Sequence, residues 1–211
     1  MTTVQSLLGL RLSSPILAEY IASIASNASI ANATVPEVKA YSDVVYLNYF
    51  ALGLSLLLAP QGGYKPASVS KLSELDSEKL VLESIDMYNA LPAKPSKTQP
   101  TFATFAALPV VLSLAGDIKN KEGKVITRQA NILVSADSTG KDFVAALHEP
   151  DRKGGGAGPS TGSIGIWCEW TMDGIMVEFG GEEAKGPQAW ERGKDACWRV
   201  LTTFQPDKAL H

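Results

Sequence analysis

The sequence has little of what metal sites and disulfide frameworks need. Among its 211 residues only two are cysteines and two are histidines. Cys168 and Cys197 both lie in apolar, strand-like runs, so we expect free thiols in a reducing compartment. Neither His148 nor His211 has a cysteine or another histidine at ligand spacing. The composition therefore predicts neither a metal site nor a bound cofactor.

Excess charge and long apolar runs are also scarce. Charged residues make up 19% of the chain, and its net charge is −3 with scattered lysines and arginines, which argues against a nucleic-acid partner. The most apolar stretch, residues 46–59, is too short to cross a membrane and contains Gly53. The first residues lack the cationic start of a secretory signal. We therefore expect a cytoplasmic protein without nucleic-acid or membrane partners.

Catalytic motifs are absent as well. Residues 149–170, EPDRKGGGAGPSTGSIGIWCEW, are rich in glycine, but they follow a predicted helix and enter a predicted strand. A phosphate-binding loop has the reverse order and carries a Gly-Lys-Ser/Thr triplet that this stretch lacks. The loop is therefore interpreted as a flexible connector. No G-x-S-x-G nucleophile motif occurs. The sequence favours a protein that is not an enzyme.

Hydrophobic periodicity and turn residues predict the elements. Ser14 and Pro15 suit the start of an amphipathic helix, and Thr139 with Asp142 suits the start of another over residues 138–149. Apolar runs predict strands, chiefly at 44–50, 52–58, 80–88, 108–115, 164–170, 174–180 and 197–204. Three prolines between residues 90 and 101 predict a stiff linker.

The two halves on either side of this linker follow one plan. Each predicted half runs from a helix through a loop to two strands around a glycine turn and then to a further strand. YLNYFALGLSLLL aligns in residue type with WCEWTMDGIMVEF, which places Gly53 over Gly174. The sequence therefore predicts an α+β fold of two tandem repeats, 1–89 and 102–211, with helices packed on one face of an antiparallel sheet.

Strand alternation sorts the side chains of the two predicted hairpins onto two faces. If Tyr49 faces Leu54 and Trp170 faces Ile175, one face of each hairpin is wholly apolar and should meet the helices. This apolar set is Leu47, Tyr49, Leu54, Leu56 and Leu58, with Cys168, Trp170, Ile175, Val177 and Phe179. The opposite face is mixed and carries the candidate partner-binding residues Tyr46, Asn48, Trp167, Glu169, Met176 and Glu178.

The helix, loop and hairpin STGKDFVAALHEPDRK…GIWCEW…DGIMVEF resembles a unit of the β-lactamase-inhibitory-protein-like superfamily. The small lipoprotein of the outer-membrane barrel-assembly machinery has a similar unit. In this chain HEP at 148–150 stands where GEP is usual. The first half of the chain resembles the same unit. The two halves together therefore resemble the tandem units of certain bacterial immunity-like proteins and fungal proteins. This resemblance implies helices on an antiparallel sheet and a protein that binds other proteins without catalysis.

These observations favour an inhibitor- or immunity-like binding protein that uses the mixed sheet face. Exposed aromatic residues ringed by polar groups often mark an interface. Two alternatives stay open. Glu169 and Glu178, diagonal on one face beside Trp167, suit a carboxylate-based hydrolase or a carbohydrate-binding protein. The same face could also pair with a second copy of the chain, so the expected partner is either another protein or the chain itself.

Overall fold

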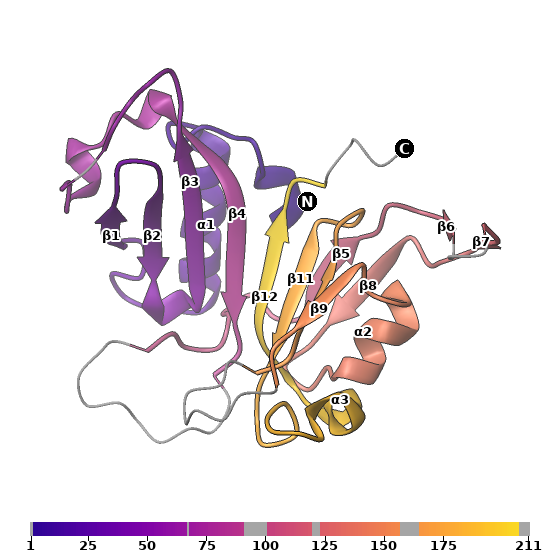
Figure 1. The fold of residues 1–211 in the computed structure, drawn as a ribbon. Coiled ribbons are helices and arrows are strands. Elements are labelled where there is room, and N and C mark those ends of the chain that lie inside the picture. The colour runs from indigo at the N-terminus through magenta and orange to yellow at the C-terminus, as the bar shows by residue number, and fades with distance from the viewer. Residues whose placement is uncertain (1, 67, 91–100, 120–122, 157–164, 207–211) are drawn as a thin grey trace. The chain divides into compact units, whose positions relative to one another are not determined.

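The computed structural model describes residues 2–66, 68–90, 101–119, 123–156 and 165–206. Within these residues the chain is built mainly of strands (Figure 1). The strands are β1 (Glu37–Ala40), β2 (Val45–Tyr49), β3 (Leu54–Pro60), β4 (Leu80–Tyr88), β5 (Val110–Ser113), β6 (Ile118–Lys119), β7 (Val125–Ile126), β8 (Asn131–Val134), β9 (Arg152–Gly154), β10 (Trp167–Trp170), β11 (Ile175–Phe179) and β12 (Trp198–Phe204).

The helices are short. The α-helices are α1 (Pro15–Asn27), α2 (Gly140–Leu147) and α3 (Ala189–Arg192). Single 3-10 turns are η1 (Val4–Leu7), η2 (Phe50–Leu52), η3 (Leu72–Glu74), η4 (Ser77–Lys79) and η5 (Gly193–Asp195). Of the helices in the described ranges, none is long and apolar enough to cross a membrane.

The fold is mainly β, so the predicted α+β class is wrong. Eight strands form one antiparallel sheet in the order β1-β2-β3-β4-β12-β11-β10-β9. Two small sheets, β5-β8 and β6-β7, accompany it. The α-helices contain only 13, 8 and 4 residues. Elements that form a minor part of the fold cannot define its class.

The predicted tandem repeat is wrong as well. The two apolar hairpins that suggested it are real, but any antiparallel hairpin with one buried face shows the same alternation of side chains. The surrounding elements differ. The second half contains the β5-β8 and β6-β7 sheets, and the first half has no equivalent among its described residues. The likeness of the two hairpins is therefore no evidence of two copies of one unit.

The chain divides into two compact units, and each is described by itself. Unit 1 comprises Met1–Ala107 and Thr202–Gln205, and unit 2 comprises Leu108–Leu201 and Pro206–His211. The predicted linker at 90–101 falls mostly on residues 91–100, which lie outside the described residues. The centre of the predicted glycine-rich connector, 157–164, lies outside them too.

In unit 1, α1 covers one face of the strands β1 to β4 (Figure 1). The helix begins at Pro15, as predicted, and buries Leu17, Ile21 and Ile24. Tyr49 pairs with Leu54, which is the predicted register. The five apolar residues predicted to face the helices are all buried. The opposite face of these strands has no helix over it among the residues described in this unit, and we call it the helix-free face.

In unit 2, α2 covers the apolar face of β10 and β11. Trp170 pairs with Ile175, again the predicted register, and the predicted apolar residues of this hairpin are buried. Phe143 of α2 contacts Phe179 edge-on, with ring centroids 6.0 Å apart. At the start of α2 the Asp142 carboxylate accepts hydrogen bonds from the backbone N–H and the hydroxyl of Thr139, which confirms the predicted cap.

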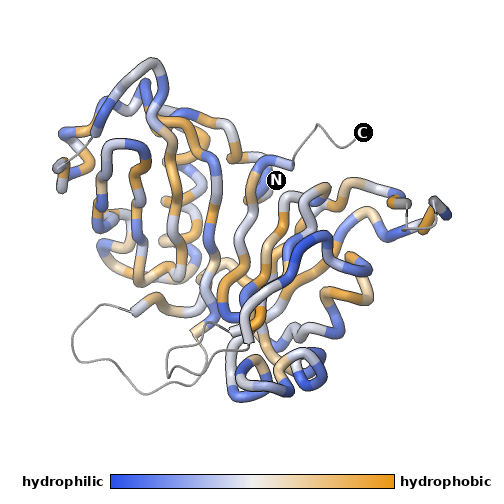
Figure 2. Tube along the Cα trace, in the orientation of Figure 1, coloured by the Kyte–Doolittle hydropathy of each residue, from blue (hydrophilic) through white to orange (hydrophobic). Residues whose placement is uncertain are grey.

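Hydrophobic residues follow the strands of both units and helix α1, whereas the region of α3 is mostly hydrophilic (Figure 2). Strands β1 and β9 were not predicted from this pattern, and β9 corrects the predicted connector 149–170, whose first residues pair with β10. Within residues 37–40, β1, only Val38 is buried, so this segment has no apolar run that would predict a strand. This strand pairs with β2 and adds Lys39 to the helix-free face, opposite Tyr46.

Candidate functional site

Tyr46 and Asn48 lie two residues apart on β2, in the part of the sheet that belongs to unit 1. The residues that alternate with them, Leu47 and Tyr49, point into the core and are buried. Tyr46 is half-buried, and Asn48 is 8% exposed. The two candidate residues therefore share the helix-free face, and their role in binding stays a prediction.

A row of polar side chains crosses the strands beside Asn48. In the sheet register Asn48 lies opposite Ser55, and Ser55 lies opposite Asp86. Ser55 Oγ donates a 2.8 Å hydrogen bond to Asn48 Oδ1, and Thr202 Oγ1 donates one of 2.8 Å to Asp86 Oδ1. Directly opposed residues project from the same face of a sheet. These four side chains therefore form one polar row across β2, β3, β4 and the end of β12.

Tyrosines surround this row and enclose a shallow hollow of about 420 Å³. Tyr41 meets the ring of Tyr46 edge-on, with centroids 6.3 Å apart. On the other side, the Tyr88 ring stacks on Phe102 at 3.7 Å. We call this site the tyrosine hollow, and its lining residues are Lys39, Tyr41, Val44, Tyr46, Asn48, Ser55, Asp86 and Tyr88.

The tyrosine hollow combines aromatic walls with a polar floor. The floor offers carboxylate oxygens from Asp86 and an amide from Asn48. Aromatic faces attract cations, and they also pack against the apolar faces of sugars and of other side chains. Lys39 also lines the hollow, and its ammonium is paired with Glu37 at 3.1 Å. The floor at Asp86 and Asn48 therefore suits a cationic group or a polyhydroxyl group that presents hydrogen-bond donors.

The other four candidate residues lie together on β10 and β11 in unit 2. Trp167 pairs with Glu178, and Glu169 pairs with Met176. The two carboxylates are therefore diagonal neighbours on one face, as predicted. All four side chains are half-buried, while the residues between them are buried in the core.

Each of these carboxylates has its own arginine. Glu169 forms an ion pair with Arg152 at 3.3 Å and accepts a 3.4 Å hydrogen bond from the Thr171 hydroxyl. Glu178 forms an ion pair with Arg199, also at 3.3 Å. Both glutamates are thus paired with an arginine from a neighbouring strand, and a catalytic role for them stays an untested alternative.

The side chain of Trp167 packs in part against Gly154 of β9. A methyl group at Gly154 would lie only 2.7 Å from Cζ2 of Trp167 and 2.9 Å from Cε2. The indole therefore lies directly over the backbone of β9, and only glycine fits beneath it. This contact uses part of the aromatic surface that the sequence assigned to a partner.

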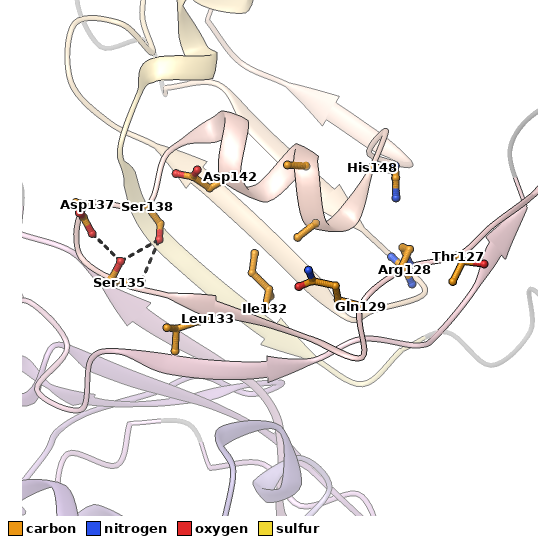
Figure 3. A pocket seen from close by; sticks show the side chains of 12 residues that line it. Thr127, Arg128, Gln129, Ile132, Leu133, Ser135, Asp137, Ser138, Asp142 and His148 are labelled. Atoms are coloured by element: carbon orange, nitrogen blue, oxygen red, sulfur yellow. Dashed lines mark hydrogen bonds between the residues drawn. The ribbon is translucent and has the colours of Figure 1, made fainter.

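A groove between α2 and β8 was not identified from the sequence (Figure 3). It encloses about 650 Å³, and we call it the α2–β8 groove. At one end the Ser135 hydroxyl donates a 2.6 Å hydrogen bond to Asp137. Arg128 and His148 lie at the other end (Figure 3). Asp142 lies at the Ser135 end (Figure 3). Along the groove between the ends lie Gln129, Ile132, Leu133, Ala145 and Ala146.

Arg128 also forms a buried ion pair that the sequence did not reveal. Its guanidinium donates two hydrogen bonds to the carboxylate of Asp173, at 2.7 and 3.0 Å, and both side chains are almost inaccessible, at 1% and 2% exposed. Nε of Arg128 donates to the carbonyl of Gly116, and Asp173 also accepts from the N–H of Ala115. This network fixes the turn between β10 and β11 and is structural.

The cysteine thiols and possible metal ligands are the other groups that could take part in chemistry. Both cysteines are free thiols, as predicted. Burial raises the pKa of Cys168 to about 11, so its thiol stays protonated and unreactive near neutral pH. Within the described ranges, no cluster of three or more histidine, cysteine, aspartate or glutamate side chains is placed to hold a metal ion.

Comparison with known proteins gave no match to a family model, a curated protein or a solved structure. The resemblance to the β-lactamase-inhibitory-protein-like superfamily therefore stays a prediction, and the function has to be argued from the tyrosine hollow and the surfaces around it.

Proposed function

We propose that this chain is a non-catalytic binding protein, inhibitor- or immunity-like, that grips a partner protein through the helix-free face of its sheet. The observation that carries the proposal is the tyrosine hollow. A row of polar groups lies beneath aromatic walls on a face that carries no helix among the described residues of unit 1. Tyrosine supplies a large, rigid contact area at low entropic cost, which is why it is enriched at protein interfaces.

The chemistry of the floor supports a basic side chain from the partner. Asp86 places a carboxylate in the hollow, held by the hydroxyl of Thr202. An arginine or lysine entering between Tyr46 and Tyr88 would meet this carboxylate and two aromatic faces. Ion pairing and cation–π attraction then act on the same group, and both strengthen as water is excluded.

The mixed face of unit 2 supplies a second contact surface in the proposal. Trp167 and Met176 offer apolar area, and the two glutamate–arginine pairs offer charges of both signs. Such compensated pairs remain solvated at the rim of an interface and favour register more than affinity. The cytoplasmic location is part of the same proposal and is supported by the two free thiols.

A capture experiment tests the proposal. Wild-type protein, Tyr46→Ala and Trp190→Ala would each be used as bait in native lysate, after circular dichroism has shown that all three fold. Trp190 is the control because it is an exposed aromatic residue, 43% accessible, in unit 2. We expect a protein that is captured by the wild type and by Trp190→Ala but not by Tyr46→Ala. Equal capture by Tyr46→Ala, or no specific capture at all, would contradict the proposal.

A further inference from the structure

Strand β8 has one paired edge and one open edge. On the paired edge, the N–H of Leu114 donates to the carbonyl of Ala130 just before β8, so Ile132 and Val134 direct their backbone groups toward β5. Asn131 and Leu133 direct theirs away from β5. Within the described ranges, the backbone groups of Asn131 and Leu133 have no hydrogen-bond partner. They form a short, unpaired sheet edge.

This open edge faces the α2–β8 groove. Beyond β8 the same edge is closed, because the N–H of Ser135 donates to the hydroxyl of Ser138 and its carbonyl accepts from Nε1 of Trp198. Ser138 leads into α2, so the helix stands on the open side of the strand (Figure 3). The groove is thus bounded by unpaired backbone on one side and by a helix on the other.

The dimensions of the groove match a short extended peptide. The eight residues of α2 span about 12 Å, and the four residues of β8 span about 13 Å. The helix lines the groove with small side chains, Ala145 and Ala146, which leave room beside the strand. Its volume of about 650 Å³ lies within the range of known ligand sites. A segment of about four residues fits this space.

We infer that the α2–β8 groove binds an extended segment of a partner protein, which adds to β8 as a third strand and places a basic residue beside Asp137 and Asp142. Strand addition pairs the exposed backbone groups of an edge and is an established mode of peptide recognition. This surface lies in unit 2, and the inference does not depend on the tyrosine hollow.

Charge selects the kind of segment. Asp137 and Asp142 are exposed at the same end of the groove. A hydrogen bond from Ser135 holds the pKa of Asp137 below its ordinary value, so this carboxylate is charged at neutral pH. A second copy of the chain fits less well. Its own β8, Asn-Ile-Leu-Val, has no basic residue, and the guanidinium of the nearby Arg128 is buried against Asp173.

The test uses a displayed library of random hexapeptides selected on the intact protein, followed by fluorescence anisotropy with the enriched peptides. Leu133→Pro removes the N–H that a third strand would need. Val111→Pro is the matched control, since Val111 pairs with Leu133 and directs its own N–H to the opposite edge of the two-stranded sheet. We expect enriched peptides with a lysine or arginine. They should bind Val111→Pro as tightly as wild type and Leu133→Pro at least about tenfold more weakly.

A second measurement does not depend on the folding of either proline variant. The peptide is N-methylated at one position at a time. Methylation at every second position should abolish binding and methylation at the positions between should not, because strand pairing uses alternate N–H groups. Asp137→Asn should lower the affinity for the basic peptides several-fold. Failure to enrich peptides, or binding that is insensitive to both N-methylation and Leu133→Pro, would overturn the inference. A dimer of the chain that Leu133→Pro dissociates would also overturn it, by assigning the edge to a second copy.

Discussion

Removal of the Arg128 guanidinium should destabilise unit 2 severely. In Arg128→Ala the carboxylate of Asp173 stays buried, at 2% exposed, and among the described residues the N–H of Ala115 is its remaining donor. Breaking a buried ion pair by removing one partner costs about 3–5 kcal/mol. A domain of ordinary stability has only about 5–15 kcal/mol in total. The variant should therefore lose a large part of the free energy of unfolding of unit 2.

The assay is urea denaturation followed by tryptophan fluorescence. All four tryptophans, at positions 167, 170, 190 and 198, belong to unit 2, so their fluorescence reports on this unit. With a urea dependence of about 1–3 kcal/mol per molar, the midpoint should fall by at least about 1 M. Arg152→Ala, which removes a 68% exposed arginine from an ion pair in the same unit, should cost no more than about 1 kcal/mol.

A double variant completes this test. Arg128→Met combined with Asp173→Leu removes both buried charges and should be more stable than either single variant, because no uncompensated charge stays in the core. If Arg128→Ala lost no more stability than Arg152→Ala, the reasoning about the buried pair would be refuted.

Two further predictions concern stability. Gly53→Ala should destabilise the chain more than Gly62→Ala in thermal denaturation. Both glycines have positive φ, which costs alanine about 1–2 kcal/mol, but only at Gly53 would the methyl group collide with neighbouring backbone. Burial raises the pKa of Cys168 from 9.0 to about 11, so the folded state keeps this proton after the unfolded chain has lost it. Stability should therefore fall between pH 9 and 11, and Cys168→Ala should show a flatter decline over this range; equal slopes would contradict the assignment.

The sequence was sufficient for local features and insufficient for long-range ones. The registers of Tyr49 with Leu54 and of Trp170 with Ile175 were predicted correctly, because a glycine turn and a period of two fix a hairpin within about a dozen residues. The fold class was wrong, because the predicted helices form only a minor part of the structure. The order of the strands was not predicted either, because it depends on pairing between distant segments. The join of β4 to β12 leaves no local signal in either strand.

The candidate sites divide in the same way. Alternation placed Tyr46 and Asn48 on the helix-free face, but Lys39 and Asp86 come from strands whose registers could not be predicted. Nothing in the sequence near Arg128 indicates its buried partner, which lies 45 residues away. The open edge of β8 could not be predicted either. Whether a strand lies at the edge of a sheet depends on which other strands pair with it, and the sequence of the strand does not contain this information.

The most direct test of the central claim is an NMR titration with two small probes, N-acetyl-arginine methylamide and cellobiose. We predict that the arginine probe shifts resonances of Tyr46, Asn48 and Tyr88, and that Asp86→Asn abolishes these shifts while the variant stays folded. No shift at the tyrosine hollow, or equal shifts in Asp86→Asn, would contradict the proposal that it receives a basic side chain. Shifts at the same residues with cellobiose alone would assign the site to carbohydrate.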